Sequence, residues 1–168
     1  LSLFGNVLTQ IQILEDTHLG FLLPAYSGSL RKSLSTHPKF YFFDPGVKRA
    51  LDQTLDVRLK PRTSAYGDAF EHWVILEVYR LNQILSSDYR LSYFQSGKTE
   101  IDIVMSKPSG SVVIEIKSSD RADPIKVRRL AALAKDFKLA QVLFLSQDKC
   151  PQMIDGVRCV HWQQGFRE

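Results

Sequence analysis

Two short stretches of the sequence place ionisable side chains among β-branched and other apolar residues. The stretch TEIDIVM contains Asp102, and the stretch SVVIEIKS contains Glu115 and Lys117. Residues two apart in a β-strand point to the same face of a sheet, so Glu115 and Lys117 share one face. The sequence KPSG between the two stretches favours a turn and an antiparallel hairpin. In such a hairpin Asp102 and Glu115 converge on one face near a strand end.

This arrangement would suit the binding of a divalent cation. Two neighbouring carboxylates resist ionising together unless a positive charge joins them. Their hard oxygen atoms are suitable ligands for Mg²⁺ or Mn²⁺. Lys117 could then hold a nucleophilic water or stabilise charge on a phosphate. The alternative interpretation is structural, because Glu-x-Lys triplets are common and the three side chains could form an ordinary ion-pair network.

The elements around these residues predict an α/β fold. The stretch 67–85 has the apolar spacing of a long helix. Its expected buried stripe consists of Phe70, Trp73, Val74, Val78, Leu81 and Leu85. Three short strands should follow, at residues 90–95, 100–105 and 111–117.

The second half of this region predicts a helix and two further strands. Asp123 and Pro124 are suited to the N-cap and first position of a helix that runs to about Lys138. The apolar strand 141–146 should be covered on both faces and pair in parallel, and a last strand at 156–162 should lie at an edge. The expected core is therefore α-β-β-β-α-β with a mixed sheet.

The first 45 residues have a different pattern. A helix at 6–15, an extended stretch at 18–24 and a strand at 39–43 surround a basic loop, PAYSGSLRKSLSTHPK. This order resembles the back half of a winged helix-turn-helix, and the alternative is a packing subdomain or linker. The predicted division is a winged-helix-like segment at residues 1–45 and an α/β domain at residues 46–168.

Composition narrows the class of protein without naming a function. With 168 residues and 44% hydrophobic content, the chain can bury one core. No apolar run is long enough to span a bilayer. The two cysteines have no CxxC spacing, which argues against a zinc site. A net charge of +4 permits contact with nucleic acid without requiring it.

Five stretches, taken in order, resemble a known superfamily. They are LEDTHLGFLLPAY, KFYFFDPGVKRAL, GDAFEHWVILEV, TEIDIVM and IEIKSS. Together they look like the PD-(D/E)xK phosphodiesterases, and more narrowly the domain of unknown function at the C-terminal part of many prokaryotic AAA-type ATPases. In place of the letters PD, this sequence has Glu100 and Ile101 before Asp102. The resemblance implies a restriction-endonuclease-like fold, a cytoplasmic location and an ATPase portion upstream of Leu1, because the chain has no P-loop.

The resemblance also implies roles for individual residues. The candidate catalytic and metal-binding residues are Glu71, Asp102, Glu115, Ile116 (through its main-chain carbonyl) and Lys117. Asp102 and Glu115 would be the metal carboxylates and Lys117 the catalytic lysine. Glu71 matches the helix glutamate that touches the metal directly or through water. Glu77 is a rival, but six residues are about 120° around a helix, so at most one of the two faces the site.

The expected function is hydrolysis of nucleic-acid phosphodiesters, DNA above all, with Mg²⁺ or Mn²⁺ as cofactor. Three basic residues could contact the nucleic-acid backbone, namely Lys126, Arg128 and Arg129. The alternative is that they only make an exposed helix face soluble. The alternative function is a catalytically silent module of the same ATPase that binds nucleic acid or a partner protein. Neither the oligomeric state nor the substrate structure follows from the sequence.

Overall fold

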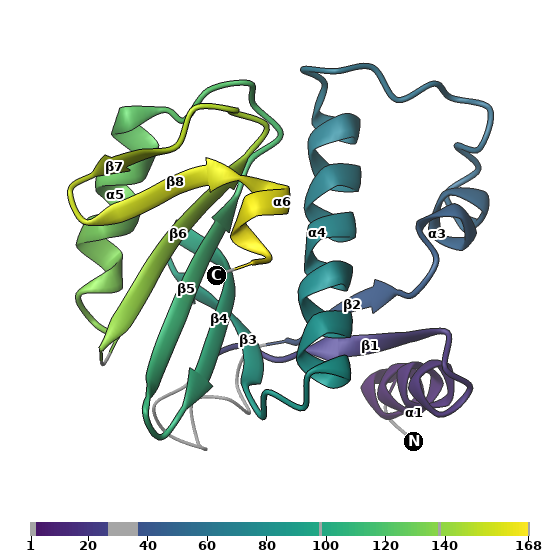
Figure 1. Ribbon diagram of the computed structural model, residues 1–168. Coiled ribbons are helices and arrows are strands. Elements are labelled where there is room, and N and C mark those ends of the chain that lie inside the picture. Colours follow the sequence, from purple (N-terminus) through teal and green to yellow (C-terminus); the bar gives the residue numbers. More distant parts are fainter. Residues whose placement is uncertain (1–2, 27–36, 98, 138, 168) are drawn as a thin grey trace.

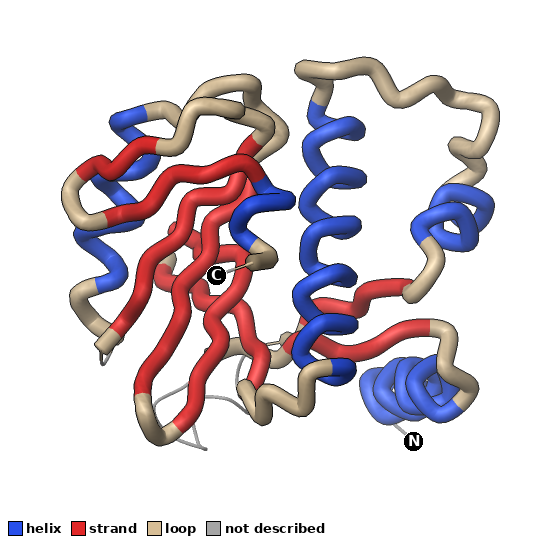
Figure 2. Tube along the Cα trace, viewed as in Figure 1, coloured by secondary structure: helices blue, strands red, loops and turns tan. Residues whose placement is uncertain are grey.

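A six-stranded mixed sheet forms the centre of the computed structural model, which describes residues 3–26, 37–97, 99–137 and 139–167. In the order in which they lie side by side, its strands are β3 (Arg90–Ser96), β4 (Thr99–Lys107), β5 (Gly110–Ile116), β6 (Ala140–Ser146), β8 (Val157–His161) and β7 (Gln152–Ile154). The long helix α4 (Ser64–Ile84) covers one face and α5 (Pro124–Ala134) covers the other (Figure 1). Figure 2 shows the resulting three layers of helix, sheet and helix.

The order α-β-β-β-α-β expected from the sequence is confirmed from α4 to β6. β4 and β5 form an antiparallel hairpin that closes with Lys107 opposite Gly110. β5 then pairs with β6 in parallel, across the connection that contains α5. Asp123 caps α5 by accepting a hydrogen bond from the N–H of Ile125. The helix ends at Ala134 rather than near Lys138, which lies outside the described residues.

The last strand is not at the edge of the sheet, and that prediction is wrong. It forms β8, which has β6 on one side and the short strand β7 on the other. Asp155 and Gly156 join β7 to β8 and both have positive φ, 48° and 80°. An Asp-Gly pair adopts this conformation readily in a two-residue hairpin turn. The turn therefore adds one more strand outside β8.

The buried surface of helix α4 is wider than the apolar stripe predicted from the sequence. Val74 and Val78 are buried as expected, but Ile75 and Leu76 are also buried. Leu85 is the C-cap residue and is 66% exposed, so its assignment to the stripe is wrong. The wider burial has a simple cause, because α4 packs against the sheet and also against a second, two-stranded sheet formed by the N-terminal residues.

The N-terminal residues form α1 (Leu3–Asp16), β1 (Gly20–Leu23), β2 (Lys39–Phe42) and α3 (Pro45–Leu51). β1 and β2 pair in an antiparallel manner, and we call this pair the N-terminal ribbon. Most of the predicted basic loop falls on residues 27–36, outside the described residues. The ribbon shares a hydrophobic cluster with α4. The division at residue 45 and the likeness to a winged helix stay predictions.

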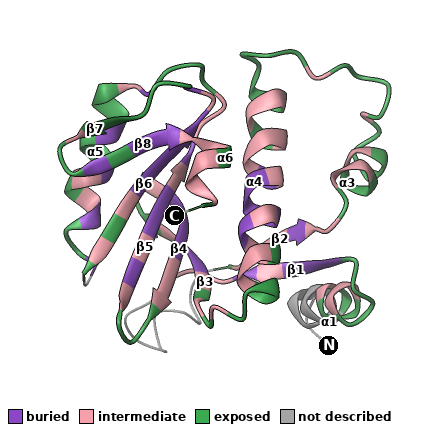
Figure 3. Cartoon of the chain, viewed as in Figure 1, coloured by how far each residue is buried: buried purple, intermediate pink, exposed green. Residues whose placement is uncertain are grey.

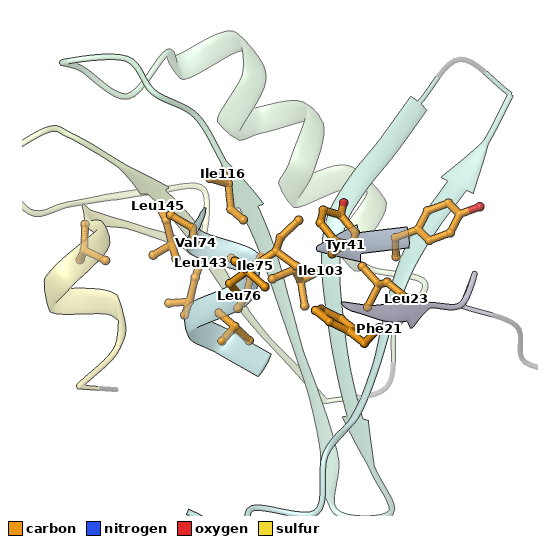
Figure 4. Packing of buried hydrophobic residues seen from close by; sticks show 14 residues of the cluster. Phe21, Leu23, Tyr41, Val74, Ile75, Leu76, Ile103, Ile116, Leu143 and Leu145 are labelled. Carbon is orange, nitrogen blue, oxygen red and sulfur yellow. The ribbon is translucent and has the colours of Figure 1, made fainter. Parts of the chain in front are cut away.

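Two buried clusters lie on opposite faces of the six-stranded sheet, one with residues of α4 and the other with residues of α5. Figure 3 shows buried stretches in the central strands and in both helices. The cluster on the α4 side includes Phe21, Leu23, Tyr41, Val74, Ile75, Leu76, Ile103, Ile116, Leu143 and Leu145 (Figure 4). The cluster on the α5 side includes Ile101, Val104, Val113, Val127, Leu130, Phe137, Phe144 and Val157. None of the described helices is both long and apolar enough to cross a membrane.

Substitution of Gly20 tests how closely the ribbon strands must approach. A Cβ atom on Gly20 would lie 2.3 Å from the carbonyl oxygen of Tyr41, a backbone atom that cannot rotate away. We expect Gly20→Ala to lower the free energy of unfolding by about 1–3 kcal/mol in urea denaturation. Gly67→Ala is the matched control, because a Cβ there would make an ordinary 3.6 Å contact with Ser118 Oγ. Equal stability of the two variants would contradict this packing.

Candidate metal centre

The candidate site lies where strands β4 and β5 separate. Their ladder ends with Ile103 opposite Ile114, whereas β5 continues beside β6 as far as Ile116 opposite Leu145. The main-chain N–H of Ile116 therefore has no main-chain acceptor opposite it in the β4–β5 ladder. The buried carboxylate of Asp102, which is 4% exposed, accepts a 2.6 Å hydrogen bond from it. This bond fixes Asp102 at the open end of the hairpin.

A β-bulge in β4 turns Asp102 toward this position. Ser92 pairs with Val104, but Phe94 pairs with Ile101, so β4 contains one more residue than β3 over this interval. Ile101 consequently belongs to the α5-side cluster and Ile103 to the α4-side cluster. The regular alternation of a strand predicts both isoleucines on one face, and for this strand that prediction is wrong. Bulges commonly re-aim a side chain next to a functional site.

Lys117 joins the two carboxylates that the sequence predicted would converge. Its Nζ lies 2.6 Å from Glu115 Oε1 and 3.3 Å from Asp102 Oδ2. The same Nζ donates a 2.8 Å hydrogen bond to the carbonyl oxygen of Ile116. The ammonium thus contacts three of the four groups that the resemblance assigned to a metal ion, and the fourth is Glu71.

Helix α4 contributes Glu71 to the same place. A pocket of about 390 Å³ is lined by Glu71, Thr99, Glu100, Asp102, Glu115, Lys117, Lys126, Arg129, Leu130 and Leu133. Of the two rival glutamates, Glu71 is therefore the one at the pocket. Glu77 lies elsewhere and forms a 2.5 Å ion pair with Arg80.

The acidic group at this pocket includes one residue that the sequence analysis did not assign. Carboxylate oxygens of Glu71, Glu100 and Asp102 all lie within 4.8 Å of one another and could hold a metal ion. Glu100 precedes Asp102 by two residues, and this spacing in a strand was a signal that could have found it. Its ion-pair partner Lys39 belongs to β2 and was also missed. Nothing in the local sequence around Lys39 indicates this contact.

Of the three residues predicted to bind the nucleic-acid backbone, two lie at the pocket and one lies away from it. Lys126 and Arg129 line the pocket from α5, and Arg129 Nη2 donates a 2.5 Å hydrogen bond to Thr99 Oγ1. Arg128 does not line it, and its Nε lies 3.4 Å from Asp155 Oδ2. Two basic side chains therefore stand beside the acidic group.

The electrostatics of the site follow from bringing these charges together away from water. Burial, followed by the charge of Asp102, raises the pKa of both Glu71 and Glu115 to about 7. Burial also raises the pKa of Asp102, against the opposing effects of the Lys117 ammonium and the Ile116 N–H. Burial alone would lower the pKa of Lys117, but Asp102 and Glu115 outweigh it and the pKa is raised. Lys117 therefore stays protonated at neutral pH.

The residues present fit a divalent cation. Oxygens of Asp102, Glu115 and Ile116 converge on a single position that the ammonium of Lys117 occupies. Hard cations such as Mg²⁺ favour oxygen ligands of this kind. Glu71 and Glu100 offer two more carboxylates, whose oxygens lie within 4.8 Å of an oxygen of Asp102. Asp102 therefore belongs to both groups of oxygen atoms.

The fold and site define a class of α/β domain with an acidic pocket and a half-buried lysine at the open end of a hairpin. The chain belongs to the family described as Domain of unknown function (DUF4143), which matches residues 66–164. No curated protein matches the sequence significantly.

Two solved structures resemble the chain at low sequence identity. Can2 from Sulfobacillus thermosulfidooxidans, in complex with cyclic tetra-adenylate, is 16% identical with a TM-score of 0.43 over 94% of this chain. Protein VC1899 from Vibrio cholerae is 13% identical with a TM-score of 0.42 over 92% of this chain. The chain spans less than half of either structure, 43% and 45%.

Proposed function

We propose that this chain is a PD-(D/E)xK domain with a restriction-endonuclease-like fold that hydrolyses nucleic-acid phosphodiesters, DNA in particular, with Mg²⁺ or Mn²⁺. The observation that supports this most is the position of Lys117. Its ammonium contacts one oxygen each of Asp102, Glu115 and Ile116. A cation already stands where the proposed cofactor would bind.

Each residue has a separate role in this proposal. Asp102, Glu115 and the Ile116 carbonyl would hold the ion, with Glu71 beside Asp102. The ion, when bound, polarises the phosphate and lowers the pKa of the attacking water. Lys117, released from its carboxylate contacts, would orient that water. It would act there as a hydrogen-bond donor.

Basic residues at and near the pocket would hold the nucleic-acid backbone. Lys126 and Arg129 line the pocket, so they would contact the phosphates beside the scissile bond. Arg128 pairs with Asp155 and would contact the backbone only after leaving this partner. We further propose that the domain, at residues 46–168, works in the cytoplasm as the C-terminal part of an AAA-type ATPase.

One observation favours a second function, a catalytically silent module of the same ATPase. The ion pairs of Lys117 satisfy the acidic groups without a metal. Among the described residues, no buried side-chain nitrogen or oxygen atom lacks a hydrogen-bond partner. Such a site could serve as a stable structural network while another surface binds nucleic acid or protein.

Replacement of Lys117 by methionine, compared with the unmodified chain, tests whether the site is a nuclease centre or a silent module. We expect Lys117→Met to reduce cleavage of nicked, branched or single-stranded DNA in Mn²⁺ by at least about 100-fold, because a donor to the reacting groups is lost. Binding of Mn²⁺ in calorimetry should remain, because the ammonium competes for the same oxygens. Lys107→Met, at the opposite end of the same hairpin, is the control and should cleave normally. Mn²⁺ binding with no cleavage by the unmodified chain would favour the silent module.

A further inference from the structure

Tyr93, in the edge strand β3 of the large sheet, makes hydrogen bonds to the chain at both strands of the N-terminal ribbon. The N–H of Tyr93 donates a 2.9 Å hydrogen bond to the carbonyl of Pro24, at the end of β1. Its hydroxyl donates a 2.7 Å hydrogen bond to the carbonyl of His37, just before β2. Tyr93 is 3% exposed. Tyr93 of β3 therefore bonds both the end of β1 and the residue just before Pro38 and β2.

This attachment places Lys39, the first residue of β2, above the aromatic ring of Tyr93. Its Nζ lies 5.0 Å from the ring centroid, within the range of a cation–π interaction. From there the ammonium forms an ion pair with Glu100. Both side chains are about one-third exposed, 31% and 35%, so the pair is partly shielded from water. Lys39 lies outside the residues that the family matches, 66–164.

Glu100 is one of the three acids that could share a metal ion, and the other two are Glu71 and Asp102. The charge of Lys39 also acts on Glu71, where it lowers the pKa against the stronger effect of burial. Tyr41, two residues further along β2, is buried and has its pKa raised by burial and then by Glu71 and Asp102. Two residues of β2, Lys39 and Tyr41, therefore lie near the acidic group.

We propose that Lys39 is a positioning residue of the metal centre, and that its ammonium competes with a divalent cation for the carboxylate of Glu100. The inference rests on the proposed metal-binding function and adds a control element from outside the matched domain. While Lys39 holds Glu100, only Glu71 and Asp102 of this group are available. Withdrawal of the partly exposed Lys39 side chain would free the third carboxylate. Lys39 thereby lowers the affinity of the centre for its cation.

The test compares Mn²⁺ affinities at one fixed pH and salt concentration by calorimetry. We expect Lys39→Met to bind Mn²⁺ about five-fold more tightly than the unmodified chain, because the competing charge is removed while the apolar part of the side chain remains. Lys39→Arg retains the charge and should stay within about two-fold of the unmodified chain. Lys107→Met removes an equal charge at the opposite end of the β4–β5 hairpin, and it should change the affinity by less than about two-fold.

A second variant shows whether Lys39 acts through Glu100. In a Glu100→Gln background, Lys39→Met should no longer change Mn²⁺ affinity, because the shared partner is neutral. Unchanged or weaker binding in the Lys39→Met single variant would overturn the inference, as would equal tightening by Lys107→Met. Tighter binding without any DNA cleavage would support it and remove the nuclease proposal. DNA cleavage by the unmodified chain, with no change of Mn²⁺ affinity in Lys39→Met, would support the nuclease proposal and overturn the inference about Lys39.

Discussion

Asp102→Asn is expected to lower the affinity for Mn²⁺ by at least about 100-fold and to abolish DNA cleavage. Asp102 is the carboxylate that both groups of oxygens share, one with Glu115 and Ile116 and the other with Glu71 and Glu100. Asparagine keeps the size of the side chain and one carbonyl oxygen. It can still accept the hydrogen bond from Ile116, so the hairpin end should keep its shape while the charge is lost.

The control for this substitution is Asp120→Asn. Asp120 is exposed and pairs with Arg62 at 3.2 Å, so its neutralisation should leave Mn²⁺ binding and thermal stability unchanged. Calorimetry gives the affinity, and circular dichroism shows whether each variant is folded. If Asp102→Asn binds Mn²⁺ as tightly as Asp120→Asn does, then Asp102 is not a ligand and the account of the site is wrong.

The ion-free protein should lose stability as pH rises from about 5 to about 8. Glu71 and Glu115 have a pKa of about 7 in the folded chain, compared with an ordinary value of 4.5. The folded state therefore binds their protons more tightly than the unfolded state does, and this contribution to stability is complete below about pH 4.5 and is lost as pH rises through 7. For these two coupled groups we expect a loss on the order of 2 kcal/mol in the free energy of unfolding.

Urea denaturation in the presence of a chelator, at a series of pH values, measures this loss. Glu115→Gln removes one of the two raised carboxyl groups, so its stability should depend less steeply on pH over the same range. Mn²⁺ added at pH 8 should restore stability to the unmodified chain, because an ion that binds only the folded state favours folding. Stability that rises between pH 5 and pH 8 without the ion would contradict the proposed electrostatics.

Much of this site followed from local sequence patterns. The alternation of side chains in β5 and the turn before Gly110 were sufficient to predict that Glu115 approaches Asp102. Helical spacing was sufficient to show that Glu71 and Glu77 could not both face the pocket, and the structure places Glu71 there. These features depend on strand and helix periods and on short connections, which a single sequence encodes directly.

Other features depend on contacts that no local pattern reveals. The bulge at Asp102 appears only when β4 is paired with β3. The ion pair between Lys39 and Glu100 joins residues 61 positions apart and requires the ribbon to dock on Tyr93. The position of β8 inside the sheet is different, because a local pattern does indicate it. The Asp155-Gly156 pair is a hairpin signal in the sequence, and it predicts a further strand beside β8.

The most direct test of the central claim is anomalous diffraction from crystals grown with Mn²⁺. The account predicts a peak between the carboxylates of Asp102 and Glu115, in contact with the Ile116 carbonyl, and a Lys117 side chain moved away from these oxygens. The account is contradicted if crystals grown at a saturating Mn²⁺ concentration show no peak at this position and Lys117 still contacts Asp102 and Glu115.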